Sequence, residues 1–332
     1  MRILTLNQFK ALLFSALFLA FQSCVVTPGQ WKNDQISSGK RDDFHQLNTT
    51  ALKYLKANDP KGLKAVLSKD MIDAGNDREV ELISNRLTDN EYKLLDEYYV
   101  VHKYRDSSMD TVRVKDGSVN RYALVYPYEA REMYMAYFIP EKSANKYMLS
   151  LVYAKLNYGW KIVKMELEPY TIDGKTAPEL FNMAKEQYAK KETQAAQMNT
   201  MLAVTCFKPG VYWQYPDEVD AGKFYTQVRD EVNTKYQYPL VLRQLATGPM
   251  ILRIYNKNTD DGYSCPVVYY MTHFDLKDTT EVKNENLKVR EAVIKLMPGL
   301  DEGKKYILYS AFNKPPTGYE SIDHFDMTQK LN

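Results

Sequence analysis

Two histidine–aspartate pairs are the residues of this sequence that come closest to acid–base chemistry. His273 and Asp275 lie two positions apart, as do His324 and Asp326. Residues i and i+2 of a β-strand point to the same face, so each pair can place an imidazole beside an orienting carboxylate. Such a pair acts as a general base only with a nucleophile or substrate in reach, and the sequence identifies neither. The favoured interpretation is therefore the polar surface of a strand.

Other catalytic signatures are incomplete. Residues 174–176 (GKT) end like a phosphate-binding loop, but Pro169 occupies the position where that loop needs glycine. Residues 143–146 have the Ser-x-x-Lys spacing, but they lie between two predicted strands and the partner motifs are missing. Residues 256–262 place the glycine of a calcium loop one position late. The four histidines, which include His45 and His102, lack metal-ligand spacing. We therefore expect no metal, no cofactor and no identifiable catalytic residue.

Cysteine chemistry is expected at three positions. Arg2 and Lys10 precede a short apolar stretch, residues 11–21, that ends just before Ser23 and Cys24. Too short to span a bilayer, this stretch is typical of a signal peptide, residues 1–23. With its terminal cysteine the leader resembles the bacterial lipobox, which implies an acylated (palmitate-bearing) Cys24 as the new N-terminus. Val25 after that cysteine points, by the same resemblance, to the outer membrane, facing the periplasm.

The remaining two cysteines leave an alternative open. Cys206 and Cys265 can form the one internal disulfide available in an oxidising compartment, or they can be two buried thiols.

Charge argues against nucleic acid as a partner. Removing Arg2 and Lys10 takes Lys+Arg from 44 to 42, against 42 Asp+Glu, so the mature chain is formally neutral. With 45% hydrophobic residues it can bury proper cores, and its length suggests about two domains. No second long apolar stretch follows the leader, so we expect the membrane to be reached through lipid alone.

The elements that follow predict an α+β fold. Residues 24–42 are polar and rich in turn formers, which indicates a flexible tether. Apolar residues at helical spacing follow, interrupted by the break at residues 58–60 (NDP). Strand patterns begin near residue 98 and continue to residue 167, which favours helices packed on an antiparallel sheet.

This order resembles the nuclear transport factor two-like superfamily, which includes SnoaL-like proteins. The resemblance covers residues 43–170 and rests on the helix–NDP–helix opening and on the closing strand 159–165 (GWKIVKM). It implies a curved, cone-like sheet wrapped on helices, with a pocket at the wide end. Inward strand positions then give the ligand-pocket candidates, with ordinary core filling as the alternative: Tyr99, His102, Tyr122, Tyr134, Tyr153 and Trp160.

The second half of the chain divides at a predicted helical hairpin, residues 171–205. Thr176 is the expected helix N-cap and Pro178 fits the first turn. One such hairpin cannot bury its own apolar face, so we expect it to pack on one or both of its neighbours. Residues 206–332 alternate helix and strand patterns and form a second α+β domain.

Three functions fit these features. The first is a lipid-anchored, non-enzymatic envelope protein that binds a small ligand or a protein partner, or serves as a scaffold. The second is a hydrolase or isomerase of SnoaL-like type that uses a His/Asp pair. The third is a structural adaptor that docks through the helical hairpin.

Overall fold

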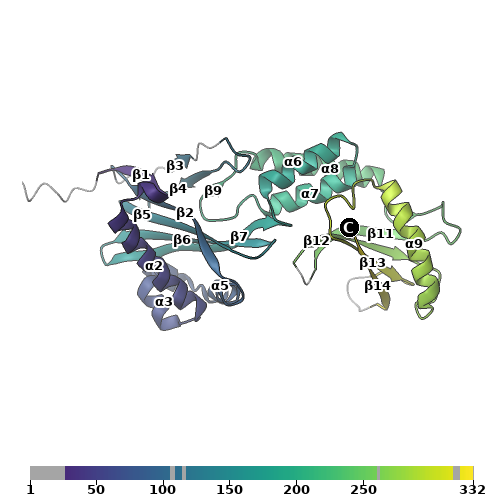
Figure 1. Cartoon of the computed structure of the whole chain (residues 1–332), viewed down its shortest axis with the longest axis horizontal. Coiled ribbons are helices and arrows are strands. Elements are labelled where there is room, and N and C mark those ends of the chain that lie inside the picture. Colours follow the sequence, from purple (N-terminus) through teal and green to yellow (C-terminus); the bar gives the residue numbers. More distant parts are fainter. Residues whose placement is uncertain (1–26, 105–108, 114–116, 260–261, 317–321, 332) are drawn as a thin grey trace, which may run out of the picture.

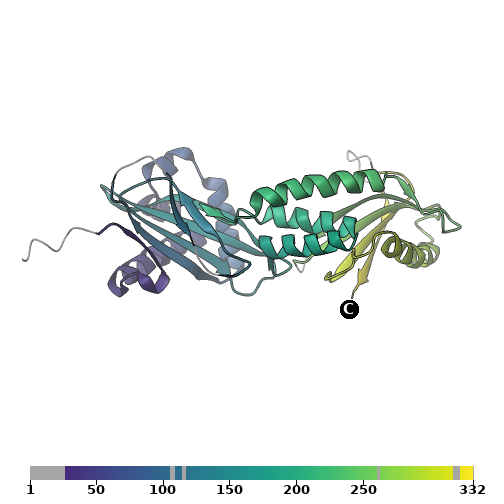
Figure 2. The same ribbon diagram turned by 90° about the horizontal axis from the view of Figure 1, so that it is seen from above.

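The computed structural model describes residues 27–331, with gaps at 105–108, 114–116, 260–261 and 317–321. The described chain is mixed α+β, with eight α-helices and three sheets, and the first sheet is antiparallel and curled (Figures 1 and 2). No helix in these residues has the length and apolar character needed to cross a membrane. The lipobox and Cys24 lie outside the described residues.

A six-stranded sheet forms the first unit, in the order β1-β2-β5-β6-β7-β8. Four helices cover one face and a small sheet, β3-β4-β9, lies on the other. Their bounds are β1 Gly29–Lys32, α2 Ser38–Lys56, α3 Pro60–Val66, α4 Lys69–Ala74, α5 Asp77–Asp89, β2 Tyr92–Val101, β3 Asp110–Arg113, β4 Ala123–Tyr126, β5 Glu132–Pro140, β6 Lys146–Leu156, β7 Gly159–Ile172, β8 Lys175–Thr176 and β9 Trp213–Gln214; a 3-10 turn, η2, spans Asn33–Gln35.

Alternation along the strands produces two separate cores in this unit. On β2, Tyr99 and Val101 face α2–α5, whereas Tyr98 and Val100 face the small sheet and the helices that follow it. Both sets are at most 5% exposed, which is expected for a sheet covered on both faces. The six-stranded sheet is therefore the middle layer of the unit.

Residues 24–42, expected to be a flexible tether, are ordered from Gly29 onward. β1 pairs antiparallel with β2, from Gly29 opposite Val101 to Lys32 opposite Tyr98. Trp31 stacks on Tyr99 at a ring-centroid distance of 5.4 Å. The polar composition concealed a short edge strand whose one large aromatic side chain docks on the core.

Three helices connect the two units: α6 Ala177–Ala189, α7 Thr193–Thr205 and α8 Glu218–Lys235. The expected cap of α6 is confirmed, because the Thr176 backbone N–H donates to Glu179 Oε2 at 2.8 Å. Leu202 of α7 packs in the core of the first unit and Met198 packs in that of the second. The hairpin therefore packs on both neighbours (Figure 2).

The residues after Cys206 do not all belong to the second unit, although the expected boundary lies there. Trp213 of β9 pairs with Leu124 of β4, and its ring stacks on Tyr122 at 3.4 Å between centroids. A two-residue strand leaves too little pattern to be recognised in a sequence.

The second unit is a five-stranded sheet with the order β10-β11-β12-β13-β14. β12 and β13 run parallel and are connected through α9, which covers one face; the other neighbours pair antiparallel. The bounds are β10 Leu240–Val241, β11 Met250–Asn258, β12 Ser264–Met271, α9 Thr279–Leu296, β13 Tyr306–Phe312 and β14 His324–Lys330.

A buried ion pair ties the two units together. Lys304 Nζ lies 3.2 Å from Asp173 Oδ2, and these side chains are 5% and 9% exposed. The other carboxylate oxygen, Oδ1, accepts a hydrogen bond of 2.7 Å from the backbone N–H of Ser264. Burial lowers the pKa of Lys304 and the Asp173 carboxylate opposes that shift, so neither charge is tolerated well without the other.

Candidate functional site

Four of the six predicted pocket residues come together on the helix-covered face of the six-stranded sheet. Tyr99, Tyr134 and Trp160 surround Phe44 of α2, with ring centroids 5.2, 4.1 and 5.2 Å from the Phe44 ring. Tyr153 follows at 5.5 Å from Tyr134. These side chains from β2, β5, β6 and β7 thus meet around one phenylalanine of α2.

These aromatic rings fill the space that they line. Phe44, Tyr134 and Tyr153 are at most 2% exposed, and Tyr99 is 5% exposed. Ring contacts at such distances are the packing of a core rather than the wall of an open cavity. The geometry therefore favours the core-filling alternative for these four positions.

The other two candidates lie elsewhere. Tyr122 is on the opposite side of the sheet, where its hydroxyl contacts Tyr98 at 2.6 Å and donates to Asp96. His102 follows the end of β2, with Nδ1 at 3.8 Å from Asp110 Oδ2. Burial lowers the His102 pKa, while the Asp110 carboxylate opposes that change. The six candidates consequently do not form one site.

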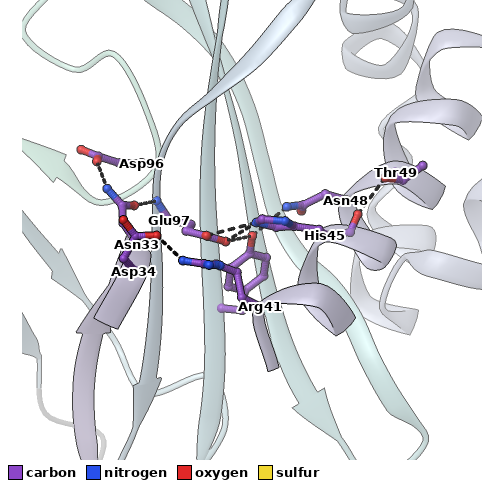
Figure 3. A network of polar contacts seen from close by, with 9 residues as sticks. Asn33, Asp34, Arg41, His45, Asn48, Thr49, Asp96 and Glu97 are labelled. Atoms are coloured by element: carbon purple, nitrogen blue, oxygen red, sulfur yellow. Dashed lines mark hydrogen bonds and ion pairs between the residues drawn. The ribbon is translucent and has the colours of Figure 1, made fainter. Parts of the chain in front are cut away.

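A buried carboxylate at the junction of α2 and the sheet carries a polar network that the sequence reasoning missed (Figure 3). Glu97, on β2, is 2% exposed. Its oxygens lie 3.1 and 3.2 Å from His45 Nε2, and Tyr134 Oη donates to Oε2 at 2.8 Å. Asn48 Nδ2 in turn donates to the Tyr134 hydroxyl at 2.7 Å.

The same junction holds the start of the ordered chain against β2. Asn33 Oδ1 accepts a 2.8 Å hydrogen bond from the Glu97 backbone N–H, and its Nδ2 donates to Asp96 Oδ1 at 2.8 Å. Arg41 pairs with Asp34 on the solvent side, as Figure 3 shows. The network thus fixes β1 and α2 on the sheet.

His45 and Glu97 form a true imidazole–carboxylate pair, and the imidazole side chain is 45% exposed. Fifty-two positions separate the two residues, so no local spacing announces the pair. Its chemistry is limited to orienting an imidazole at the surface. In the described residues, no set of three or more His, Cys, Asp or Glu side chains could hold a metal ion.

One of the two predicted His/Asp pairs is present. His324 Nε2 lies 3.4 Å from Asp326 Oδ2 on β14, and Ser310 Oγ donates to Asp326 Oδ1 at 2.6 Å. β12 ends at Met271, so His273 lies beyond the strand, and Asp275 accepts a hydrogen bond from the backbone N–H of Lys277 at 2.9 Å. The second pair therefore lacks the strand that would align it.

Cys206 and Cys265 are two buried thiols, not a disulfide. Cys265 Sγ contacts the carbonyl oxygen of Lys257 at 3.5 Å on the neighbouring strand. Burial raises the pKa of the Cys206 thiol to about 12. Neither sulfur is placed for nucleophilic chemistry.

An open groove of about 610 Å³ lies where β7 meets the ends of α7 and α8. Glu166, Glu168 and Glu218 are among its lining residues. Burial raises the pKa of Glu166, with the Glu168 carboxylate adding to the shift. Glu166 and Glu168 repel each other, whereas Glu218 is paired with Lys208, 3.2 Å away at the same groove. The groove therefore has no buried, unpartnered polar side chain, among the described residues, that would indicate a ligand.

The face of the five-stranded sheet that α9 leaves uncovered is the strongest candidate for binding. Register places Arg253, Tyr269, Ser310 and Asp326 in one row across β11 to β14. The α9-facing core uses the alternate positions on these strands, such as Tyr270 and Tyr309. α9 lies on the opposite side of the sheet from the Arg253 row (Figures 1 and 2). Arg253 and Asp326 are exposed, whereas Val267 and Phe312 on the same side are 2% and 3% exposed, so the open part of this face is the part around Arg253.

Aromatic rings and one cation organise this uncovered face. The Arg253 guanidinium lies 4.5 Å from the ring centroid of Tyr269 and 4.9 Å from that of Tyr255. Tyr269 contacts Phe312 at 4.9 Å, and Phe312 stacks on His324 at 5.3 Å. Arg253 is therefore held by cation–π contacts while its charge faces solvent.

Comparison with known proteins gives no relative: neither a family model, nor a curated protein, nor a solved structure matches the chain.

Proposed function

We propose that this chain is a lipid-anchored, non-enzymatic binding protein of the bacterial envelope. Acylated Cys24 holds it to the membrane. The sheet of the second unit binds an acidic glycan on the face opposite α9. The first unit, a nuclear transport factor two-like cone, is the scaffold between anchor and binding surface.

Two features support the anchor and the scaffold. The leader with its terminal cysteine supports acylation and an outer-membrane, periplasm-facing location. Helices packed on a curled antiparallel sheet support the cone, and its interior is occupied by the rings around Phe44. A filled cone has no room for the substrate of a SnoaL-like enzyme, so the scaffold role is favoured.

The observation that carries the binding role is the exposed Arg253 guanidinium, which lies over the rings of Tyr255 and Tyr269 on the sheet face opposite α9. The planar guanidinium matches a carboxylate or phosphate through two parallel hydrogen bonds. The faces of the flanking rings carry negative potential, which attracts the C–H groups of a sugar ring. A saccharide with acidic groups satisfies both features.

Charge on the rest of this face agrees with an acidic ligand. Lys257 and Lys330 lie on the same side of the sheet as Arg253 and are exposed. Asp326 is the acidic residue of the row, and its oxygens are already engaged by Ser310 and His324. Positively charged side chains therefore outnumber the negatively charged ones named on this face, which favours the binding of a polyanion.

Calorimetric titration with three polymers tests the proposal: oligogalacturonate, neutral dextran and polyglutamate. We expect binding to oligogalacturonate alone, and Arg253→Gln should weaken it at least tenfold, since a hydrogen bond to a charged group contributes about 1.5–3 kcal/mol. Arg229→Gln is the matched control, because this exposed arginine also lies over a tyrosine ring, 5.9 Å from Tyr225. Equal binding of polyglutamate, or equal losses in both variants, would reject the saccharide site.

The adaptor hypothesis is disfavoured by burial of the hairpin. Most of α7 is buried, including Ala196, Met198 and Leu202, and both neighbouring units pack on it. A docking surface needs an exposed apolar patch that these helices do not present.

A further inference from the structure

The first strand, β1, begins only a few residues after the proposed anchor. Four residues, 25–28, separate Cys24 from Gly29, the first residue of β1. Because an extended chain spans at most ~3.6 Å per residue, Gly29 lies within about 18 Å of the acylated cysteine. The expected long tether would have let the protein turn freely, whereas this short one holds a single end of the six-stranded sheet near the bilayer.

Strand register identifies that end. Gly29 lies opposite Val101, the last residue of β2, and Val101 lies opposite Glu132, the first residue of β5. The hairpin between β6 and β7, at residues 156–159, lies at the same end because Ala154 pairs with Met133. We call this the anchor end; it points away from the second unit, as the left side of Figure 1 shows.

Three large side chains at the anchor end are exposed without a core to join. Tyr104, three residues beyond β2, is 69% exposed, and Met109, just before β3, is 58% exposed. Tyr158, at the tip of the β6–β7 hairpin, is 44% exposed. Met109 lies next to β1, because Gln30 Nε2 of β1 donates a hydrogen bond of 3.3 Å to the carboxylate of Asp110, the residue after Met109.

Basic side chains accompany these exposed residues. Lys103 Nζ lies 5.0 Å from the ring centroid of Tyr104, and Lys69 and Lys161 lie 5.6 and 5.9 Å from that of Tyr158. The buried carboxylate at this end, Glu132, is neutralised by two lysines at 3.1 and 2.7 Å. The anchor end thus combines aromatic groups with lysine side chains beside them.

We propose that the anchor end lies on the bilayer surface, with Tyr104, Met109 and Tyr158 in the headgroup layer and the adjacent lysines on lipid phosphates. Tyrosine prefers the membrane interface because its ring is apolar and its hydroxyl is polar. Lysines near the surface are attracted to anionic lipid, and one acyl anchor is strengthened by such a second contact. This inference rests on the proposed acylation of Cys24.

The orientation has a consequence for the second unit. The molecule is elongated, with the five-stranded sheet at the end opposite the anchor end (Figures 1 and 2). Lying on the bilayer through the anchor end, the protein projects the Arg253 face into the aqueous space and away from the lipid.

The test uses the full acylated lipoprotein in vesicles of phosphatidylethanolamine with one quarter phosphatidylglycerol. Each of the variants Tyr104→Cys, Tyr158→Cys and, as a matched exposed control, Leu287→Cys carries an environment-sensitive fluorophore on the new cysteine. Leu287 on α9 is 55% exposed. The native Cys206 and Cys265 are buried and are not labelled under native conditions. Lipids with a spin-labelled headgroup region then quench fluorophores that lie at the bilayer surface.

We expect at least threefold stronger quenching at positions 104 and 158 than at position 287. Equal quenching at all three positions, in protein that floats with the vesicles, would overturn the orientation while leaving the anchor intact. Protein that does not float with the vesicles would overturn the anchor itself, and the inference with it. Flotation therefore separates failure of the proposed function from failure of this inference.

Discussion

Glu132 is the residue whose replacement best tests how the first unit is held together. Its carboxylate accepts hydrogen bonds from Lys155 at 2.7 Å, Tyr99 at 2.5 Å and Lys40 at 3.1 Å. Burial alone raises the pKa of Glu132, but these three donors outweigh it and lower the pKa to about 2. The group thus joins α2, β2, β5 and β6 through one ionised side chain.

The expected magnitude follows from that pKa. A displacement from 4.5 to about 2 corresponds to about 3 kcal/mol of stability, and solvent screening at the partly exposed Lys155 reduces it to about 2 kcal/mol. The folded state holds Glu132 deprotonated more strongly than the unfolded state does. Its contribution is therefore complete above pH 4.5 and is lost as pH falls from 4.5 towards 2.

Urea unfolding of Glu132→Gln against the parent chain measures this contribution. All three tryptophans of the chain, Trp31, Trp160 and Trp213, lie in the first unit, so tryptophan fluorescence follows this unit alone. We expect the variant to be about 2 kcal/mol less stable at pH 7, with the gap closing towards pH 2. Glu141→Gln is the control, because its partner Lys93 is 70% exposed and such a pair contributes less than about 1 kcal/mol.

A gap that is unchanged between pH 7 and pH 3 would refute the reasoning, because a glutamine does not titrate and only the ionised Glu132 can produce the pH dependence. A loss as large in Glu141→Gln would show that general surface charge, not the buried carboxylate, is responsible.

Two further predictions concern the second unit and its junction. Asp173→Asn should lower the free energy of unfolding by about 3 kcal/mol, because it leaves Lys304 buried and unpaired. The measurement is denaturant unfolding followed by far-ultraviolet circular dichroism, and adding Lys304→Met should restore most of the lost stability. If the double variant is no more stable than Asp173→Asn, the loss is not due to the unpaired charge. An aromatic disulfide reagent should react with neither Cys206 nor Cys265 in the native chain and with both in urea, whereas two unreactive positions in urea without reductant would reveal a disulfide.

Features that depend on interactions between residues close in the sequence were predicted correctly. The Thr176 cap, with Pro178 in the first turn, is where the sequence placed it, because cap chemistry acts over three or four residues. The α+β class also followed from the change of period between helices and strands.

Long-range partners were not predictable in the same way. His45 and Glu97 meet only after α2 folds onto β2, and β9 joins β4 across some ninety residues of chain. Residues 29–32 form a strand because they pair with β2 and Trp31 stacks on Tyr99; their own composition does not favour a strand. Such contacts depend on the tertiary fold, and a single sequence has no periodicity that records them.

The candidate pocket shows how the same pattern can have two outcomes. Inward positions on a curved sheet converge, and Tyr99, Tyr134, Tyr153 and Trp160 do so. Whether they surround a ligand or one another depends on the helix that covers them, and Phe44 of α2 occupies the centre.

Arginine modification with and without ligand is the most direct test of the proposed binding surface. The acylated protein is treated with phenylglyoxal in the presence of saturating oligogalacturonate or dextran, and each arginine is quantified by mass spectrometry. We expect oligogalacturonate to slow the modification of Arg253 at least tenfold and to leave that of Arg229 unchanged, while dextran changes neither rate. Unchanged modification of Arg253 under saturating oligogalacturonate would contradict the proposed binding surface.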